Sequence, residues 1–147
     1  MGLKRILRDL VGLRPIRLQV AALCLRGSGD ARQVLLVTSR DTGRWLLPKG
    51  WPMRGKGLAA SALEEAWEEA GVRGTVQPRS VGRYHDIKRA PGGAMDEPVR
   101  VLVFRVDDVR MHSEFPEAGQ RERQWVSPAE AARMVEEGSL ADLLRRV

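Results

Sequence analysis

The sequence has one cysteine, two isolated histidines and no long apolar run, and each shortage excludes a class of structure. Cys24 has no partner for an internal disulfide; it lies in an apolar run and is expected to be a small core residue. No apolar stretch approaches the roughly 20 residues that a membrane-spanning helix needs. His85 and His112 belong to no catalytic or metal-binding motif and are expected to have structural or surface roles. A single domain in a reducing cytoplasm is therefore the expectation.

Acidic residues are outnumbered by basic ones. There are 19 Asp and Glu against 25 Lys and Arg, which gives a net charge of +6 and a pI near 10.4. The surface potential therefore favours anionic partners. Nucleic acid is one such partner, but the chain has no zinc-finger spacing, no basic strand interleaved with aromatic residues and no helix-turn-helix pattern, so only charge supports it. A basic protein with one acidic cluster indicates instead a metal site among side chains that hold phosphate.

The acidic charge is concentrated in one short segment. Glu65, Glu68 and Glu69 stand at positions i, i+3 and i+4, so on a helix they fall within an arc of roughly 100°. Like charges so placed repel by roughly a few tenths of a kcal/mol per pair unless a cation neutralises them. Carboxylate oxygens are ligands that suit Mg²⁺ or Mn²⁺. The spacing therefore predicts a site for a divalent metal.

The residues around these acids predict a helix over 58–70. Gly57 stands at the N-cap position, and Gly71 follows where a left-handed C-cap residue is expected. The arc opposite the acids is apolar and rich in alanine, which lets the helix lie close to a sheet. Its residues are Ala59, Ala62, Leu63, Ala66, Trp67 and Ala70.

The segment over 50–72 resembles the signature of the Nudix hydrolases. That pattern is a glycine, five residues, a glutamate, seven residues and then R-E-U-x-E-E-x-G-U, in which U is a bulky apolar residue. The matching positions are Gly50, Glu65, Glu68, Glu69, Gly71 and Val72. A strand with Trp45 leads through P-K-G into the loop and helix, as in the family.

Three positions depart from the signature. Lys56 replaces its first glutamate, Glu64 replaces its arginine, and Ala66 replaces a bulkier apolar residue. In the family, the arginine orients the neighbouring glutamates. The three core acids are nevertheless all present.

The resemblance implies an α/β fold, a Nudix-like α-β-α sandwich around a mixed β-sheet, over residues 16–147. Apolar runs bounded by turn residues predict the strands, and Gly27 to Asp30 is expected to be a turn. The predicted strands are 16–25, 33–38, 45–47, 74–76, 81–87, 99–106 and 123–126. The segment over 88–98 is rich in Gly, Pro and charge and is expected to be a mobile loop.

The two ends of the chain carry helix patterns. Leu3, Ile6, Leu7 and Leu10 predict an amphipathic helix over 2–13, within a separate N-terminal segment 1–15. It is expected to pack on the domain or on a second copy of the chain as a homodimer; a membrane-surface anchor is the alternative.

The C-terminal part opens on a capping box. In Ser127-Pro128-Ala129-Glu130, Ser127 is the N-cap and Glu130 is expected to reach back to it. Gly138 is expected to end this helix, and a last amphipathic helical segment follows over 140–147.

The loop before the acidic helix suggests a substrate class. Lys49 and Gly50, followed by Trp51, are similar to the family branch that hydrolyses diadenosine polyphosphates and diphosphoinositol polyphosphates, as is the late segment 121–125. Basic residues would bind the phosphates, and Trp51 would stack on an adenine. The basic candidates are Lys49, Arg54 and Lys56 in the loop, and Arg83, Lys88 and Arg89 across the cleft.

The resemblance also implies a mechanism. Glu65, Glu68 and Glu69, with the Gly50 carbonyl, would hold one to three Mg²⁺ (or Mn²⁺) ions that activate water and neutralise phosphoryl charge. Glu68 or Glu69 would take the proton from water, with Glu122 as a further candidate. Alternative substrates are a nucleoside triphosphate, a nucleotide sugar or a capped RNA end. Glu64 and Lys56 favour a different class, a domain that binds nucleotide or polyphosphate without turnover.

Overall fold

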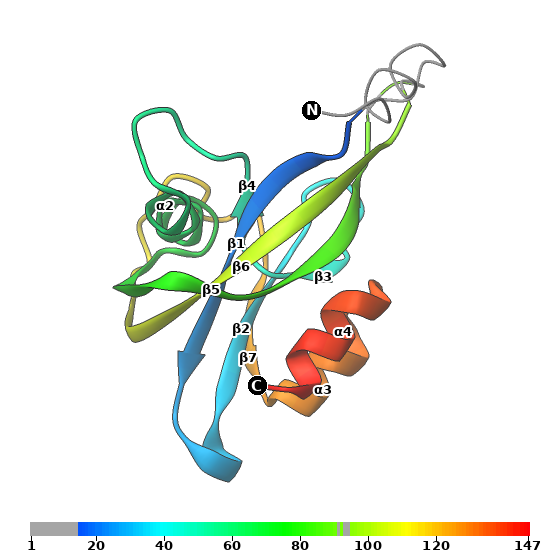
Figure 1. Cartoon of the computed structure of the whole chain (residues 1–147). Coiled ribbons are helices and arrows are strands. Elements are labelled where there is room, and N and C mark those ends of the chain that lie inside the picture. Colours follow the sequence, from blue (N-terminus) through cyan, green and yellow to red (C-terminus); the bar gives the residue numbers. More distant parts are fainter. Residues whose placement is uncertain (1–14, 91, 93–94) are drawn as a thin grey trace.

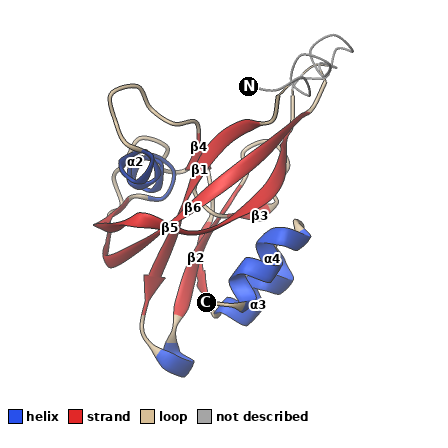
Figure 2. Ribbon diagram, in the orientation of Figure 1, coloured by secondary structure: helices blue, strands red, loops and turns tan. Residues whose placement is uncertain are grey.

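One mixed β-sheet lies between two helical layers in the computed structural model, which describes residues 15–90, 92 and 95–147 (Figure 1). Helix α2 (Leu58–Ala70) covers one face, and α3 (Pro128–Met134) and α4 (Gly138–Arg145) cover the other (Figure 2). This arrangement confirms the predicted α-β-α sandwich. The helix predicted over 2–13 lies outside the described residues.

Seven strands form the sheet, in the order β3-β2-β1-β6-β5, with β4 paired to β1 and β7 paired to β2. β1 and β6 are parallel, and the other pairs are antiparallel. The strands are β1 (Arg17–Arg26), β2 (Gln33–Thr38), β3 (Trp45–Leu46), β4 (Lys49–Gly50), β5 (Val72–Lys88), β6 (Glu97–Met111) and β7 (Arg123–Val126), and η1 (Gly29–Ala31) is a 3-10 turn.

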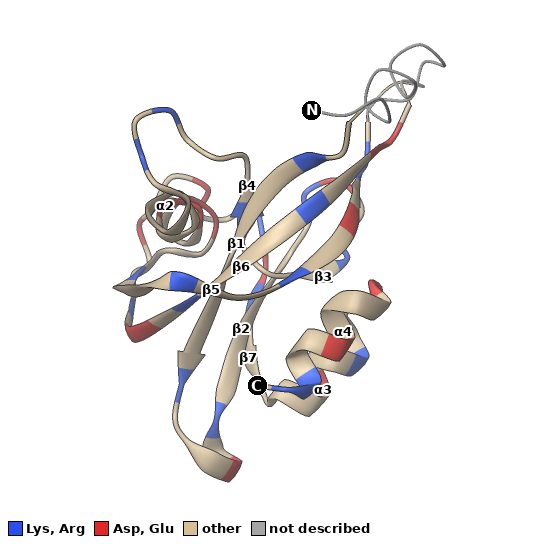
Figure 3. Cartoon of the chain, viewed as in Figure 1, with Lys and Arg blue, Asp and Glu red and all other residues tan. Residues whose placement is uncertain are grey.

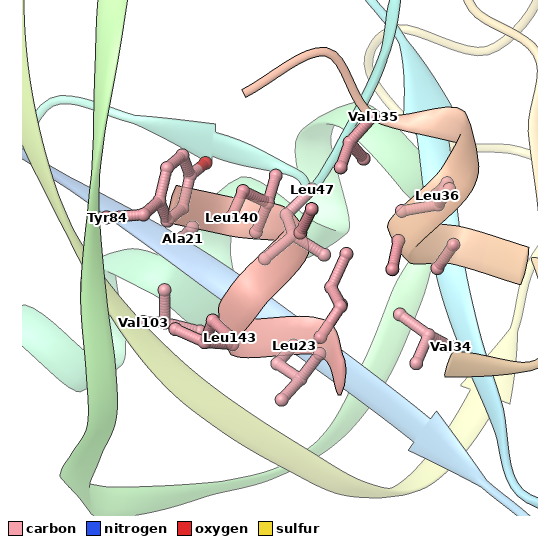
Figure 4. Close-up of a cluster of buried hydrophobic side chains, with 14 of the residues drawn as sticks. Ala21, Leu23, Val34, Leu36, Leu47, Tyr84, Val103, Val135, Leu140 and Leu143 are labelled. Carbon is pink, nitrogen blue, oxygen red and sulfur yellow. The ribbon is translucent and has the colours of Figure 1, made fainter. Parts of the chain in front are cut away.

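The central strands are apolar on both faces because a helical layer covers each face. In β1, Val20, Ala22 and Cys24 pack with the alanines of α2. Ala21 and Leu23, which alternate with them, pack toward α3 and α4 (Figure 4). Burial raises the pKa of the Cys24 thiol to about 12, so Cys24 is a core residue, as predicted, and a poor nucleophile.

Strands β1 and β2 separate soon after the turn that joins them. They pair only at Leu25↔Val34 and Arg26↔Gln33. Beyond this point β4 takes the place beside β1, through Val20↔Gly50, and β3 takes the place beside β2. The sheet is therefore split, and the short chain between β3 and β4 bridges the split next to α2.

The predicted helix over 58–70 and the strands over 33–38 and 123–126 agree with the structure at both ends. Gly71 has the predicted left-handed conformation, with φ 67°, and its N–H bonds to carbonyls in the last turn of α2. The chain over 74–76 and 81–87, expected to be two strands, is one long strand, β5. Its pairing with β6 shifts register between Val76 and Ser80, where Pro78 has no N–H to donate, so the expected break is a bulge.

The expected loop over 88–98 is shorter than predicted, because Lys88 pairs with Glu97 at the end of the β5-β6 ladder. Ser127 caps α3 by accepting a hydrogen bond from the Glu130 N–H. The Glu130 carboxylate instead accepts hydrogen bonds from Arg133, one turn on. None of the described helices combines the length and apolar character of a membrane span.

Candidate metal and phosphate site

A cavity of about 430 Å³ opens where the sheet splits, beside α2. β4 contributes Lys49 and Gly50, and α2 contributes Glu65 and Glu69. Gln19, Leu46 and Trp51 also line it, and the rest of the wall comes from the loops over 39–44 and 117–121 and from the end of β5 with the residue after it, over 87–89. Figure 3 shows acidic positions on α2 and basic positions on the neighbouring strands.

The Glu65 carboxyl group lies against the backbone of Gly50. A Cβ atom at position 50 would overlap this carboxyl group, so this placement of the Glu65 side chain requires a glycine there. Burial, together with the negative charges of Glu69, Glu68 and Glu117, raises the pKa of Glu65 to about 8. A group so placed is easily protonated unless a cation lies nearby.

Both oxygens of the Glu69 carboxylate accept hydrogen bonds from the protein. Oε1 accepts from the Lys49 main-chain N–H at 3.0 Å, and Oε2 accepts from Arg121 Nη2 at 3.1 Å. Burial nevertheless raises the pKa of Glu69 to about 7, against the opposing effects of Arg121 and the Lys49 N–H. The carboxylate is thus fixed in direction while its ionisation is disfavoured.

Glu68 lies on the same helix but does not line the cavity. Burial and the charges of Glu64 and Glu117 raise its pKa. Glu117, which the sequence reasoning did not select, lines the cavity, and its main-chain N–H donates to the Glu68 carbonyl at 3.0 Å. Glu122, the further candidate for a base, is exposed and does not line the cavity; its N–H donates to Thr38 Oγ1.

The donor atoms on this wall suit a hard divalent cation. Among residues 15–90, 92 and 95–147, no three acidic, His or Cys side chains are gathered closely enough to enclose an ion by themselves. Mg²⁺ is commonly bound by one or two carboxylates together with waters and substrate phosphates, so a closed protein cage is not required. The raised pKa values of Glu65 and Glu69 and the glycine-dependent placement of Glu65 fit a position that a cation completes.

Beneath the cavity is a buried network of opposite charges. Arg44 donates to both oxygens of Asp86, at 3.1 and 3.3 Å, and lies 3.5 Å from Glu137. Lys49 Nζ donates to Gln19 Oε1 at 2.6 Å and lies 3.3 Å from Asp86. Burial lowers the pKa of Lys49; burial opposes the ionisation of Asp86, but its cationic partners lower its pKa. Lys49 lines the cavity, as predicted, with its ammonium group already paired.

The other predicted phosphate ligands fall into two groups. Lys88 and Arg89 line the cavity, as do Arg40 and Arg44, which the sequence reasoning did not select. The second group does not line it: Arg54, Lys56 and Arg83. His85 and His112, which are expected to have structural or surface roles, do not line it either. Lys56 Nζ is 3.1 Å from a carboxylate oxygen of Glu64.

Trp51 lies at the edge of the cavity. Its indole ring already has the Arg17 guanidinium 4.0 Å from its centroid, a cation–π geometry. Any adenine that stacked here would therefore use the other ring face or displace Arg17.

Sequence comparison agrees with this geometry. The model of the NUDIX domain family matches residues 15–147. The chain is 30% identical to Nudix hydrolase 21, chloroplastic, of Arabidopsis thaliana over 93% of its own length and 64% of that protein. It is 32% identical to Nudix hydrolase 4 of the same plant over 67% of its length and 45% of that protein. The chain thus spans less than two thirds of the length of these relatives.

Solved structures with similar folds include a C. elegans Ap4A hydrolase, with a TM-score of 0.60 at 18% identity over 90% of this chain and 96% of that one. Another is the NUDIX domain of Shewanella oneidensis NrtR complexed with ADP ribose, with a TM-score of 0.61 at 15% identity over 99% and 98% of the two chains. At these identities the likeness is one of fold.

Proposed function

The chain belongs to the Nudix family, and from this premise we propose that it hydrolyses a pyrophosphate bond in a phosphate-rich small molecule with Mg²⁺ or Mn²⁺. The observation that carries the proposal is that one cavity is lined both by the carboxyl groups of Glu65 and Glu69 and by the basic side chains of Arg40, Lys88 and Arg89. The carboxylates would hold the cation and the basic side chains would hold phosphate, so a polyphosphate in this cavity would be bound through both.

Glu65, Glu68 and Glu69, with the main-chain carbonyl of Gly50, are the proposed metal ligands. These residues would hold a divalent cation, which would supply a lowered pKa of bound water and neutralisation of charge on the transferred phosphoryl group. One of the same carboxylates, Glu68 or Glu69, is the proposed acceptor of the proton that the attacking water loses. The hydrogen bonds from Lys49 N–H and Arg121 keep Glu69 directed for either role. No covalent nucleophile is needed.

The proposed substrates are diadenosine polyphosphates or diphosphoinositol polyphosphates. Arg40, Lys88 and Arg89 line the cavity, with Arg40 3.5 Å from Glu117 and Arg89 3.0 Å from Asp96, and a longer phosphate chain would reach more of these side chains than a diphosphate would. Arg40 and Arg89 are about half exposed, so their contacts with phosphate are screened by salt. Trp51, at the edge of the same cavity, is the proposed contact for a base, and Arg54 and Lys56 in the loop stay predictions as outer phosphate contacts.

Two further readings use the same cavity. The first is hydrolysis of a different substrate by the same reaction: a nucleoside triphosphate, a nucleotide sugar or an RNA 5′ end. A binding module without turnover is favoured by Lys56 and Glu64, where the signature has residues of opposite charge. The NrtR domain complexed with ADP ribose is an example of a Nudix domain that holds a nucleotide.

A substrate panel tests the proposal. Purified protein is assayed for phosphate release on diadenosine tetraphosphate, a diphosphoinositol polyphosphate, ADP-ribose and ATP, each with Mg²⁺, with Mn²⁺ and with EDTA. Glu69→Gln is the matched negative control, since it removes the charge of one proposed ligand and keeps its shape. Metal-dependent turnover that is lost in E69Q supports hydrolysis. Tight binding of a substrate with no turnover in the presence of Mg²⁺ or Mn²⁺ would refute hydrolysis and support the binding-module hypothesis.

The cytoplasmic location expected from the lone cysteine, and the homodimer expected from the apolar pattern of residues 2–13, stay proposals. Cell fractionation and light scattering of the purified chain would check them separately.

A further inference from the structure

The two charged departures from the family signature contact each other. Lys56 stands at the position of a glutamate and Glu64 at that of an arginine, and their side chains form an ion pair at 3.1 Å. The pair has the polarity opposite to that which the signature residues would have. Both side chains are partly exposed, and neither lines the cavity. Glu64 has no N–H to donate from its side chain, so it cannot orient a neighbouring carboxylate as an arginine would.

A different arginine contacts the acids of α2. Arg121, in the chain between β6 and β7, donates from Nη2 to Glu69 Oε2 at 3.1 Å, from Nε to Glu117 Oε1 at 3.1 Å and from Nη1 to the Thr38 carbonyl at 3.0 Å. Its side chain is only 8% exposed, as is that of Glu69. The guanidinium therefore connects α2, the loop over 112–122 and the end of β2 in a fixed arrangement.

We propose that Arg121 is a positioning residue that orients Glu69, and so takes over from the arginine that the signature would have at position 64. This inference rests on the proposed function, in which Glu69 is a metal ligand. With the Lys49 N–H on one oxygen and Arg121 on the other, the Glu69 carboxylate cannot rotate without breaking a hydrogen bond. Partners of this kind typically change metal affinity or activity by about 10- to 100-fold when they are removed.

The geometry specifies an arginine and not merely a positive charge. Three acceptors on three different segments are reached by three separate nitrogens of one planar group. The lysine ammonium is a single point on a flexible stem, so it can pair with Glu69 but cannot hold all three acceptors. Arg121→Lys should therefore behave more like Arg121→Gln than like the wild type.

The test measures Mn²⁺ binding without substrate, by calorimetry, beside kcat and KM on the best substrate of the panel. R121K and R121Q should weaken Mn²⁺ binding by about tenfold and lower kcat by about 10- to 100-fold, with KM changed less than about threefold. Arg123→Gln is the matched control: Arg123 is also partly buried and donates to the carbonyls of Ala70 and His112, but contacts no carboxylate of the site. It should lower the melting temperature while leaving Mn²⁺ affinity and kcat close to wild type.

Wild-type Mn²⁺ affinity in folded R121K and R121Q would overturn the proposal. A higher KM with unchanged kcat and metal affinity would also overturn it, because Arg121 would then be a substrate ligand. A loss of metal affinity equal to that of R123Q would reduce Arg121 to a general stabilising role and reject positioning. Because metal binding is measured without turnover, failure of the hydrolase proposal would appear separately, as a wild-type protein that binds Mn²⁺ but hydrolyses nothing in the panel.

Discussion

Gly50→Ala tests the contact on which the acidic wall depends. A Cβ at position 50 would lie 2.7 Å from Glu65 Oε2 and closer still to Oε1, against an ordinary separation of at least 3.4 Å. The carboxyl group must therefore move by about 1 Å, and displacements of this size in an active site lower rates by about a hundredfold. Because the atoms in the way are the end of one side chain, the fold should survive with a loss of about 1–3 kcal/mol.

The assay compares kcat, Mn²⁺ affinity and the melting temperature of G50A with those of wild type. Glu65→Asp supplies the control: its shorter side chain withdraws from position 50, so in the E65D background the added methyl group should change the melting temperature much less than in wild type. Unchanged turnover and metal affinity in G50A would refute the reasoning, because the position of Glu65 would then not matter.

Three further predictions follow from the same contacts. Burial raises the pKa of Glu65 to about 8 and that of Glu69 to about 7, above the ordinary value of 4.5, so between about pH 5 and 8 the metal-free folded protein holds more protons than the unfolded chain. Its free energy of unfolding should therefore fall as pH rises through this range. Urea unfolding in EDTA should show that E65Q stabilises the protein by on the order of a few kcal/mol at pH 8 but little at pH 5. The opposite slope would show that these groups are already ionised without metal. The double variant Lys88→Ala with Arg89→Ala should raise KM several-fold for a tetraphosphate and by less for ADP-ribose, and the difference should shrink in 0.5 M salt. Equal changes in KM for both substrates would show that these two residues do not bind the additional phosphates. The partly exposed pair Lys56 and Glu64 should have a coupling free energy of only about 0.2–1 kcal/mol in a double-mutant cycle of K56A and E64A. The charge-swapped variant K56E/E64R should keep kcat near wild type because Arg121 still contacts Glu69; a large rise in kcat would instead identify the natural pair as a defect.

Local signals in the sequence were sufficient for the acidic helix. Gly57 and Gly71 delimit it, the alanine stripe identifies the buried face, and the spacing of Glu65 and Glu69 places both carboxylates on the cavity side. Each of these signals depends on residues within one or two helical turns. The helix was therefore predicted to its last residue.

Long-range contacts were beyond the same reasoning. Arg121 reaches Glu69 across 52 positions of sequence, and that contact depends on where β6 ends and β7 begins. Lys49 is predicted from its neighbours in the chain to bind phosphate, and it lines the cavity; those neighbours could not predict that its ammonium group pairs with Gln19 and Asp86, which lie on other strands. The continuity of β5 across Pro78 was missed because the pairing with β6 outweighs the local preference for a break.

The split between β1 and β2 also has a consequence for how this protein could be redesigned. The acids and Gly50 lie on α2 and β4, elements fixed by the sheet, whereas Arg40, Lys88 and Arg89 lie in the segments over 39–44 and 87–89. The proposed cation ligands and the proposed phosphate contacts are thus on separate segments of chain. A combinatorial library confined to these two segments, with the largely buried Arg44 kept, could sample new substrate preferences while every member keeps the same acidic centre.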